Sequence, residues 1–148
     1  MIHSDVILLV EDSEADYEAT VRALRTAGLA NPMYRCADGE QALDFLYRRG
    51  VYADPFRSPR PGVILLDLNL PGTDGHEVLR DVKGDAGLKQ IPVIVLTTSI
   101  AERDIAACYQ DGANSYIVKP VGFENLVQAI QRLQDYWFEL VVLPKAGA

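Results

Sequence analysis

Short apolar runs alternate along the chain with amphipathic stripes of helical period. The runs are rich in β-branched residues, which is typical of strands buried on both faces of a parallel sheet. Pro92 precedes one of them, at a strand start where a missing amide donor is tolerated. The pattern predicts strands at residues 6–10, 33–37, 63–67, 93–97 and 115–118.

Helix signals lie between and after these runs. Ser13 is a typical N-cap three residues before Asp16, and Gly28 lies where the first helix should stop. Ser99 and Glu102 have the spacing of a capping box for a fourth helix. The apolar stripes of the first, second, third and fifth helices are, in that order, Tyr17, Val21 and Leu24; Ala42, Phe45 and Leu46; Val78, Leu79 and Val82; and Phe123, Leu126, Val127, Ile130 and Leu133.

Five strands and five helices in strict alternation predict an α/β fold. Such a pattern indicates a doubly wound parallel sheet with right-handed crossovers and helices on both faces. The 148 residues fit a single domain with one core. Residues 50–62 contain three prolines and two arginines, which indicates a surface loop before the third strand.

Composition and charge narrow the function classes. A net charge of -7 argues against direct nucleic-acid binding, which usually needs a basic surface. The apolar runs are shorter than the roughly 20 residues that a membrane span requires, and the first residues lack the pattern of a signal peptide. Cys36 and Cys108 have no metal-type spacing and are expected to be buried, reduced thiols. We therefore expect a cytoplasmic protein without membrane association.

Polar side chains stand at the carboxyl ends of four predicted strands, the edge where open parallel sheets bind ligands. Carboxylates gathered there would repel one another unless a cation lay between them. Hard oxygen ligands select Mg²⁺ or Mn²⁺. The residues are Glu11 and Asp12 after the first strand, Asp67 ending the third, Thr97 and Thr98 at the fourth, and Lys119 after the fifth.

Each of these residues also has an ordinary explanation. A single aspartate at a strand end is usually a turn or cap residue, and threonines there often cap the next helix. A lysine before a proline is ordinarily solvated. The coincidence of such residues at four strand ends of one sheet favours a chemical site over four separate structural roles.

The segments around these residues resemble the receiver domains of bacterial response regulators. The resemblance covers roughly residues 5 to 137, with the motifs in the family's order and spacing. The long loop before the third strand and the ending at 136–144 resemble the subfamily that pairs with phytochrome-type sensor kinases. The matching segments are residues 9–12, 65–75, 95–98 and 116–120.

This resemblance implies a flavodoxin-like receiver with strand order 2-1-3-4-5 and a phosphoryl-accepting site. Asp67 would be the nucleophile that becomes an aspartyl phosphate. Glu11 and Asp12 would hold Mg²⁺, with Mn²⁺ as the alternative, together with Asp67 and the backbone carbonyl of Asn69. The metal would neutralise charge on the transferring group.

The remaining site roles follow from the same resemblance. Lys119 would pair with Asp67 or with the phosphate oxygens, and a cis peptide before Pro120 would aim it. The Thr97 hydroxyl and the Thr98 amide would bind the phosphate. Tyr116 would be an aromatic switch that turns inward when Thr97 moves.

The resemblance also implies the partner and the kind of activity. The phosphodonor would be a sensor histidine kinase, of phytochrome type if the subfamily resemblance holds. The protein would be a regulatory phosphoacceptor that catalyses only its own phosphoryl transfer and autodephosphorylation. With no output domain expected after the last helix, its output would be a change in protein contacts.

Two alternatives belong to other function classes. Phosphatases of the haloacid-dehalogenase class also use an aspartate at a strand end, but they carry a second aspartate two residues later. Asn69 occupies that position here and cannot relay a proton. The other alternative is a docking module that is never phosphorylated, for which the complete acidic set would have no use.

The C-terminal sequence suggests self-association. We divide the chain into a receiver domain at 1–138 and a tail at 139–148 that serves as a dimer arm. A monomer would expose an unusually large apolar patch there, so we expect a homodimer that uses the tail and the face of the fourth helix, fifth strand and fifth helix. The alternative is that Trp137 and Phe138 fold back on their own subunit. The apolar residues are Tyr136, Trp137, Phe138, Leu140, Val141, Val142 and Leu143.

Overall fold

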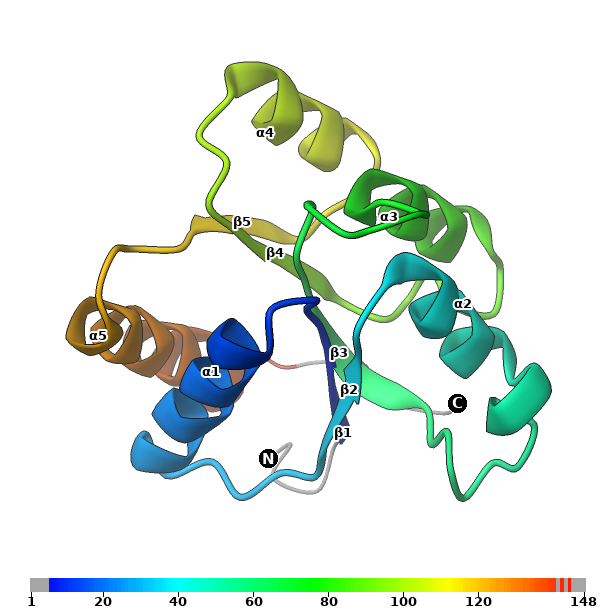
Figure 1. The fold of residues 1–148 in the computed structure, drawn as a ribbon, viewed down its shortest axis with the longest axis horizontal. Helices are drawn as coiled ribbons and strands as arrows, with labels where there is room; N and C mark the ends of the chain where they lie inside the picture. The colour runs from blue at the N-terminus through cyan, green and yellow to red at the C-terminus, as the bar shows by residue number, and fades with distance from the viewer. Residues whose placement is uncertain (1–5, 141, 143, 145–148) are drawn as a thin grey trace.

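A central five-stranded parallel sheet carries helices on both faces (Figure 1). The computed structural model describes residues 6–140, 142 and 144, without the side chains of 138–140. The strand order is β2-β1-β3-β4-β5, and all neighbouring strands are parallel. The predicted fold class and strand order are therefore confirmed. The strands are β1 (Val6–Val10), β2 (Met33–Cys36), β3 (Pro61–Leu66), β4 (Val93–Thr97) and β5 (Ser115–Val118).

The helices follow the predicted stripes. The Ser13 hydroxyl accepts a hydrogen bond from the Asp16 amide at the start of α1, as expected, and Gly28 lies two residues after its end with a φ of 93°. The loop before β3 begins with the short 3-10 helix η1 (Gly50–Tyr52). The longer helices are α1 (Glu14–Thr26), α2 (Gly39–Tyr47), α3 (Gly75–Gly84), α4 (Glu102–Gln110) and α5 (Phe123–Leu133), followed by the π-helical segment η2 (Gln134–Leu140).

The predicted capping box of α4 is wrong. The N-cap is Ala101, which has no side-chain cap, and the helix begins at Glu102. The Ser99 hydroxyl instead donates to the Asp104 carboxylate at 2.6 Å and accepts from the Ala101 amide at 3.3 Å. A hydrogen bond to a charged acceptor is stronger than one to a neutral group, so the carboxylate holds this hydroxyl.

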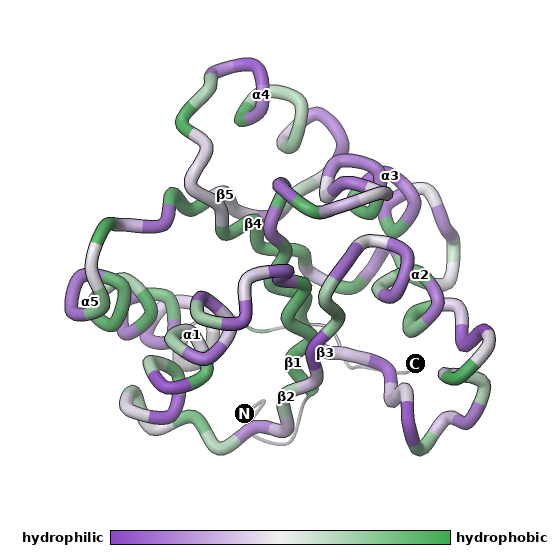
Figure 2. Tube along the Cα trace, viewed as in Figure 1, coloured by the Kyte–Doolittle hydropathy of each residue, from purple (hydrophilic) through white to green (hydrophobic). Residues whose placement is uncertain are grey.

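Two apolar cores lie on opposite faces of the sheet. Successive residues of β1 alternate between them: Leu8 and Val10 face α2 and α3, whereas Ile7 and Leu9 face α1 and α5. Figure 2 shows the resulting continuous hydrophobic colour of the central strands, with mixed colours on the helices. Burial on both faces explains why these strands are unbroken apolar runs in the sequence.

Neighbouring helices differ greatly in how much they bury. α3 buries Gly75, Val78, Leu79 and Val82, whereas Cys108 is the only buried residue of α4, all of which the structure describes. Both cysteines of the chain are buried and unpaired, as expected. The few apolar contacts of α4 make it the least firmly attached of the long helices.

The C-terminal helices partly match the expected pattern. Leu126, Ile130 and Leu133 are buried against the sheet, but Phe123 is 44% exposed and lies outside the apolar core. Trp137 packs against the core shared by α1 and α5, so this residue folds back on its own chain. The expected arm residues Val141 and Leu143 lie outside the described residues. No helix within the described part is long and apolar enough to cross a membrane.

Candidate functional site

Backbone pairing brings the predicted polar residues to one edge of the sheet. The amide of Asp67 donates to the carbonyl of Val10 at 3.0 Å, and the amide of Lys119 donates to the carbonyl of Thr97 at 2.7 Å. The end of β1 is therefore level with the end of β3, and the end of β4 is level with the end of β5. Glu11, Asp67 and Lys119 are buried at this edge.

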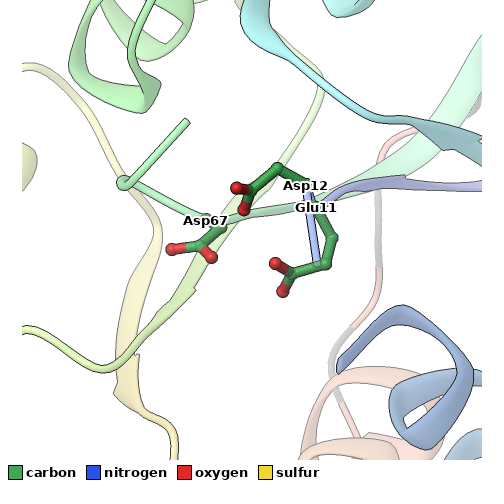
Figure 3. Close-up of side chains that lie close together, drawn as sticks. All are labelled: Glu11, Asp12 and Asp67. Atoms are coloured by element: carbon green, nitrogen blue, oxygen red, sulfur yellow. The ribbon is translucent and has the colours of Figure 1, made fainter. Parts of the chain in front are cut away.

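Three carboxylates form a compact acidic group. One oxygen each from Glu11, Asp12 and Asp67 lies within 4.8 Å of the others, and Figure 3 shows the three side chains gathered beside the ends of β1 and β3. Asp12 is exposed, whereas the other two are buried, so the group opens to solvent on one side. Oxygen ligands at this spacing suit a hard divalent cation, which would relieve their mutual repulsion.

Lys119 lies against this group and contacts three carboxylates. Its ammonium donates to Glu11, to Asp67 at 3.2 Å and to Asp16 at 3.1 Å. Burial by itself would lower the pKa of Lys119, but its hydrogen bond with Glu11 and the charges of Glu11 and Asp67 raise that pKa above its ordinary value. The lysine is therefore a permanent cation that neutralises part of the acidic group.

The pKa of Glu11 is raised from 4.5 to about 7. Burial is the largest cause; the hydrogen bond and charge of Lys119 oppose it, and the charge of Asp67 reinforces it. Glu11 therefore binds a proton more readily than an ordinary glutamate does. A cation bound here would compete with that proton.

The loop after β3 is held close to the start of α3. The Asn69 amide donates to a carboxylate oxygen of Asp67 at 3.2 Å, and the Gly75 amide donates to the carbonyl of Leu68 at 3.0 Å. A Cβ atom at Gly75 would lie 2.3 Å from the carbonyl oxygen of Asp67. Only glycine permits this approach, which fixes the backbone that carries Asp67 and Asn69.

The threonines at the end of β4 differ in exposure. Thr98 is exposed, whereas Thr97 is fully buried and its hydroxyl has no hydrogen-bond partner among the described residues. Buried hydroxyl groups are almost always hydrogen-bonded, and an unsatisfied one is costly. The Thr97 side chain is thus an unpaired donor at the end of β4, the strand next to β3.

Tyr116 on β5 belongs to a network that reaches α3. It is half-buried, packs against the core of α2 and α3, and donates its hydroxyl to the carbonyl of Ser99 at 3.0 Å. The Ser99 hydroxyl in turn donates to Asp104, whose other carboxylate oxygen lies 3.0 Å from Nε2 of His76. The bond from Ser99 lowers the pKa of Asp104, with the contact to His76 acting in the same direction.

The backbone before Pro120 differs from the expectation. The cis peptide before Pro120 is absent, because all peptide bonds of the described residues are trans. Lys119 is oriented by its three carboxylate partners instead. His76 on α3 contacts Asp104 on α4 and so joins the two helices.

Sequence reasoning missed Asp16 as a neighbour of the site. It stands in the first turn of α1, where an acidic residue ordinarily favours the helix start. Its spacing from Glu11 is the signal that could have found it, since a helix that follows a strand directly returns its first turn to the strand end.

The family of the chain follows from comparison with known proteins. Residues 7–131 match the family described as "Response regulator receiver domain". The chain belongs to this family. It is a receiver domain of a two-component response regulator, whose function is phosphorylation on an aspartate, and it is a regulatory phosphoacceptor rather than a catalytic enzyme. The phosphatase alternative is therefore set aside.

Relatives match over nearly the whole chain. Response regulator Rcp1 of Synechocystis sp. is 44% identical over 141 residues, which cover 95% of this chain and 94% of that protein. The crystal structure of its Mn²⁺-bound form superimposes with a TM-score of 0.88 at 43% identity, covering 95% of this chain and 99% of that one. The structure of the phosphorylated cyanobacterial phytochrome response regulator RcpA gives 0.90 at 39% identity, covering 96% and 99%.

These comparisons support the binding of a divalent metal ion. A solved relative holds Mn²⁺, receiver domains bind divalent metal, and this chain has three clustered carboxylates of the type that such ions require.

Proposed function

We propose that Asp67 is the residue that accepts the phosphoryl group. The observation that supports this assignment is the position of Asp67. It is buried at the end of the central strand, 3.2 Å from the Lys119 ammonium and grouped with Glu11 and Asp12. Its carboxylate therefore contacts the Lys119 cation and also belongs to a candidate site for a metal cation. Phosphoryl transfer depends on such positioning and charge neutralisation more than on covalent chemistry by the protein.

Mg²⁺ is the ion we assign to the acidic group, with Mn²⁺ as the alternative. Glu11, Asp12 and Asp67 would hold it through their carboxylates, and Asn69 through its backbone carbonyl. The Asn69 amide bond to Asp67 supports this choice, because it keeps that backbone beside the acidic group. The bound ion would neutralise charge on the transferring group.

Lys119, Thr97 and Thr98 would bind the phosphoryl oxygens. Lys119 supplies a permanent positive charge, and the unpaired hydroxyl of Thr97 supplies a donor without breaking an existing hydrogen bond. The amide of Thr98 would be a further donor. Together with Asp67, Lys119 and Thr97 form the catalytic set.

Thr97 and Tyr116 would couple the phosphoryl group to the surface of the protein. Movement of Thr97 toward a phosphoryl oxygen would pull on Ser99, two residues later, whose carbonyl accepts the Tyr116 hydroxyl bond. Tyr116 would then turn further inward and change the face of α4, β5 and α5. Phosphorylation would thereby shift a two-state equilibrium.

The partner we assign is a sensor histidine kinase of phytochrome type. The support is the similarity to RcpA, which is a phytochrome response regulator, over nearly the whole chain. We assign the protein to the cytoplasm, without binding to nucleic acid or membrane, in line with its net charge of -7.

Phosphotransfer from a panel of autophosphorylated kinases of the same cell tests the acceptor assignment. Wild-type protein should take up one phosphoryl group in a Mg²⁺-dependent reaction, and the product should be labile in mild base. Asp67→Asn should take up none. Asp81→Asn, which changes an exposed aspartate on α3, is the matched control and should react like wild type. Labelling of Asp67→Asn at the wild-type rate would refute the assignment.

The homodimer remains part of the proposal, together with the division into a receiver at 1–138 and a tail at 139–148. Tyr136 is 54% exposed and Val142 is 94% exposed, so apolar surface remains after Trp137 has packed on its own chain. Sedimentation of the full chain and of a chain ending at Asp135 separates the contributions. A full chain that stays monomeric with and without phosphorylation would exclude the dimer. Equal dimerisation of both chains would leave the α4, β5 and α5 face as the interface.

A further inference from the structure

A third carboxylate reaches Lys119 from outside the acidic group. The Lys119 ammonium donates to Asp16 at 3.1 Å, although Asp16 is not among the three residues whose oxygens gather within 4.8 Å. We propose that Asp16 is a positioning residue that holds Lys119 in the resting protein and competes with the phosphoryl group for it. This inference rests on the proposed roles of Asp67 and Lys119.

A capping role does not account for the Asp16 carboxylate. The Asp16 amide donates to the Ser13 hydroxyl at 3.2 Å, so the N-cap of α1 is in place. In a capping box the acidic side chain would accept a bond from the Ser13 amide in return. That amide donates to Glu11 instead, at 3.2 Å, and the Asp16 carboxylate contacts Lys119.

The backbone of Asp16 is fixed relative to the site. Its carbonyl accepts the Thr20 hydroxyl at 2.8 Å, and the contact of the Ser13 amide with Glu11 joins the start of α1 to the end of β1. The carboxylate therefore approaches Lys119 from a first turn that is hydrogen-bonded to the end of β1. A change of charge at Asp16 alters one partner of Lys119 and leaves the other two in place.

Asp16 is the partner that Lys119 can release at least cost. An ammonium has three donors, and in the resting protein they serve Glu11, Asp67 and Asp16. Donation to a phosphoryl oxygen requires one of these bonds to open. The Asp16 side chain is 48% exposed, against 8% and 9% for Glu11 and Asp67, so water can replace the lysine around Asp16.

Removal of the Asp16 charge should therefore speed phosphorylation. Asp16→Asn keeps the size of the side chain but weakens its hold on Lys119, and it also removes a negative charge near the incoming phosphoryl group. Loss of an ion pair in which one partner is partly exposed should raise the phosphorylation rate about two- to five-fold. Because the effect is electrostatic, it should shrink as salt is added.

The experiment measures the rate of phosphorylation by a small phosphodonor, such as an acyl phosphate, at saturating Mg²⁺ and low ionic strength. Glu14→Gln is the matched control, because Glu14 is the other acidic residue in the first turn of α1 and is exposed. It reports any effect of charge on the helix start alone. Asp16→Glu should return the rate toward that of wild type by restoring a carboxylate.

A rate for Asp16→Asn that equals or falls below that of Glu14→Gln overturns the proposal, as does a gain that does not shrink with salt. Asp16→Ser, which suits a helix start, replaces Asp16→Asn should the latter not fold. An Asp67→Asn variant run in parallel separates the two proposals. If it is labelled as fast as wild type, the acceptor assignment fails; if it is not labelled and Asp16→Asn shows no gain, only the role of Asp16 fails.

Discussion

Two neighbouring regions at the carboxyl edge of the sheet are each destabilised, but by different interactions. The charged region consists of Glu11, Asp12, Asp67 and Lys119, where buried carboxylates repel one another around a single ammonium. The hydroxyl region is centred on Thr97, whose neutral donor is buried without a partner. The two lie beside each other on the strands β1, β3, β4 and β5.

This difference determines which solution conditions change the stability of each region. Repulsion between carboxylates depends on cations, salt and pH, because each of these alters the charge or its screening. The cost of an unpaired neutral hydroxyl depends on none of them and is removed only by a hydrogen-bond acceptor. A divalent cation can therefore relax the charged region alone, whereas a phosphoryl group at Asp67, as proposed, would supply oxygens to both.

The largest expected effect tests the backbone that supports the charged region. Gly75→Ala would place a Cβ atom 2.3 Å from the carbonyl oxygen of Asp67, and backbone atoms cannot yield as a flexible side chain can. We expect a loss of about 3 kcal/mol in the free energy of unfolding, and slower phosphorylation. Urea unfolding measures the first. Gly84→Ala, at the other end of α3 with nothing within 4 Å, is the control and should be neutral or slightly stabilising.

A variant of the hydroxyl region should gain stability. Thr97→Val keeps the branched shape but removes the unpaired hydroxyl, which should raise the free energy of unfolding by roughly 2 kcal/mol. The gain should be the same with and without Mg²⁺ and at low and high salt. A gain that changes with Mg²⁺ would show that the two regions are not separable in this way.

A variant of the charged region should gain stability only in metal-free solution. Asp67→Asn removes one of the carboxylates that lie within 4.8 Å of one another. Lys119 keeps Glu11 and Asp16 as partners, so the repulsion removed should exceed the attraction lost, and we expect a net gain of about 1 kcal/mol. Thermal unfolding in chelator measures it. With Mg²⁺ the order should reverse, because the ion stabilises the wild-type protein through ligands that the variant lacks.

A pH dependence of the stability that originates at Glu11 is also expected. Its pKa is raised from 4.5 to about 7 by burial and by Asp67, against the opposing effect of Lys119. Between pH 4.5 and about 7 the folded protein therefore holds a proton on Glu11 that the unfolded chain has released. The stability that this proton contributes is complete below pH 4.5 and is lost as the pH rises through about 7.

Unfolding in chelator across this pH range should show the loss in wild type but not in Glu11→Gln. The difference between the two proteins isolates Glu11 from other titrating groups. Equal pH profiles for the two would contradict the prediction. Added Mg²⁺ should flatten the wild-type profile, because the ion keeps Glu11 ionised.

The sequence predicts the strand-end residues well because their positions follow from topology. In a parallel sheet, the residue after each apolar run reaches the same edge whatever the helices do. Glu11, Asp67 and Lys119 therefore meet as expected, although they are far apart in the chain.

Contacts between helices and strand ends could not be predicted in the same way. The approach of Asp16 to Lys119 depends on the direction in which α1 leaves β1, and the contact of His76 with Asp104 depends on how α3 and α4 are rotated. The Ser99 hydroxyl had two acceptable partners by spacing, and the choice between a helix cap and Asp104 was decided by charge.

The sparse packing of α4 has a consequence for divergence between related proteins. Cys108 is its one buried residue among nine, all described, so most of its positions can change without loss of the core. Surface substitutions of this kind usually alter stability by less than about 0.5 kcal/mol. A duplicated copy of the gene could thus acquire a new partner by changes on α4 while its phosphoryl chemistry stayed intact. Insulation between parallel signalling pathways can arise on such a helix at little cost to folding.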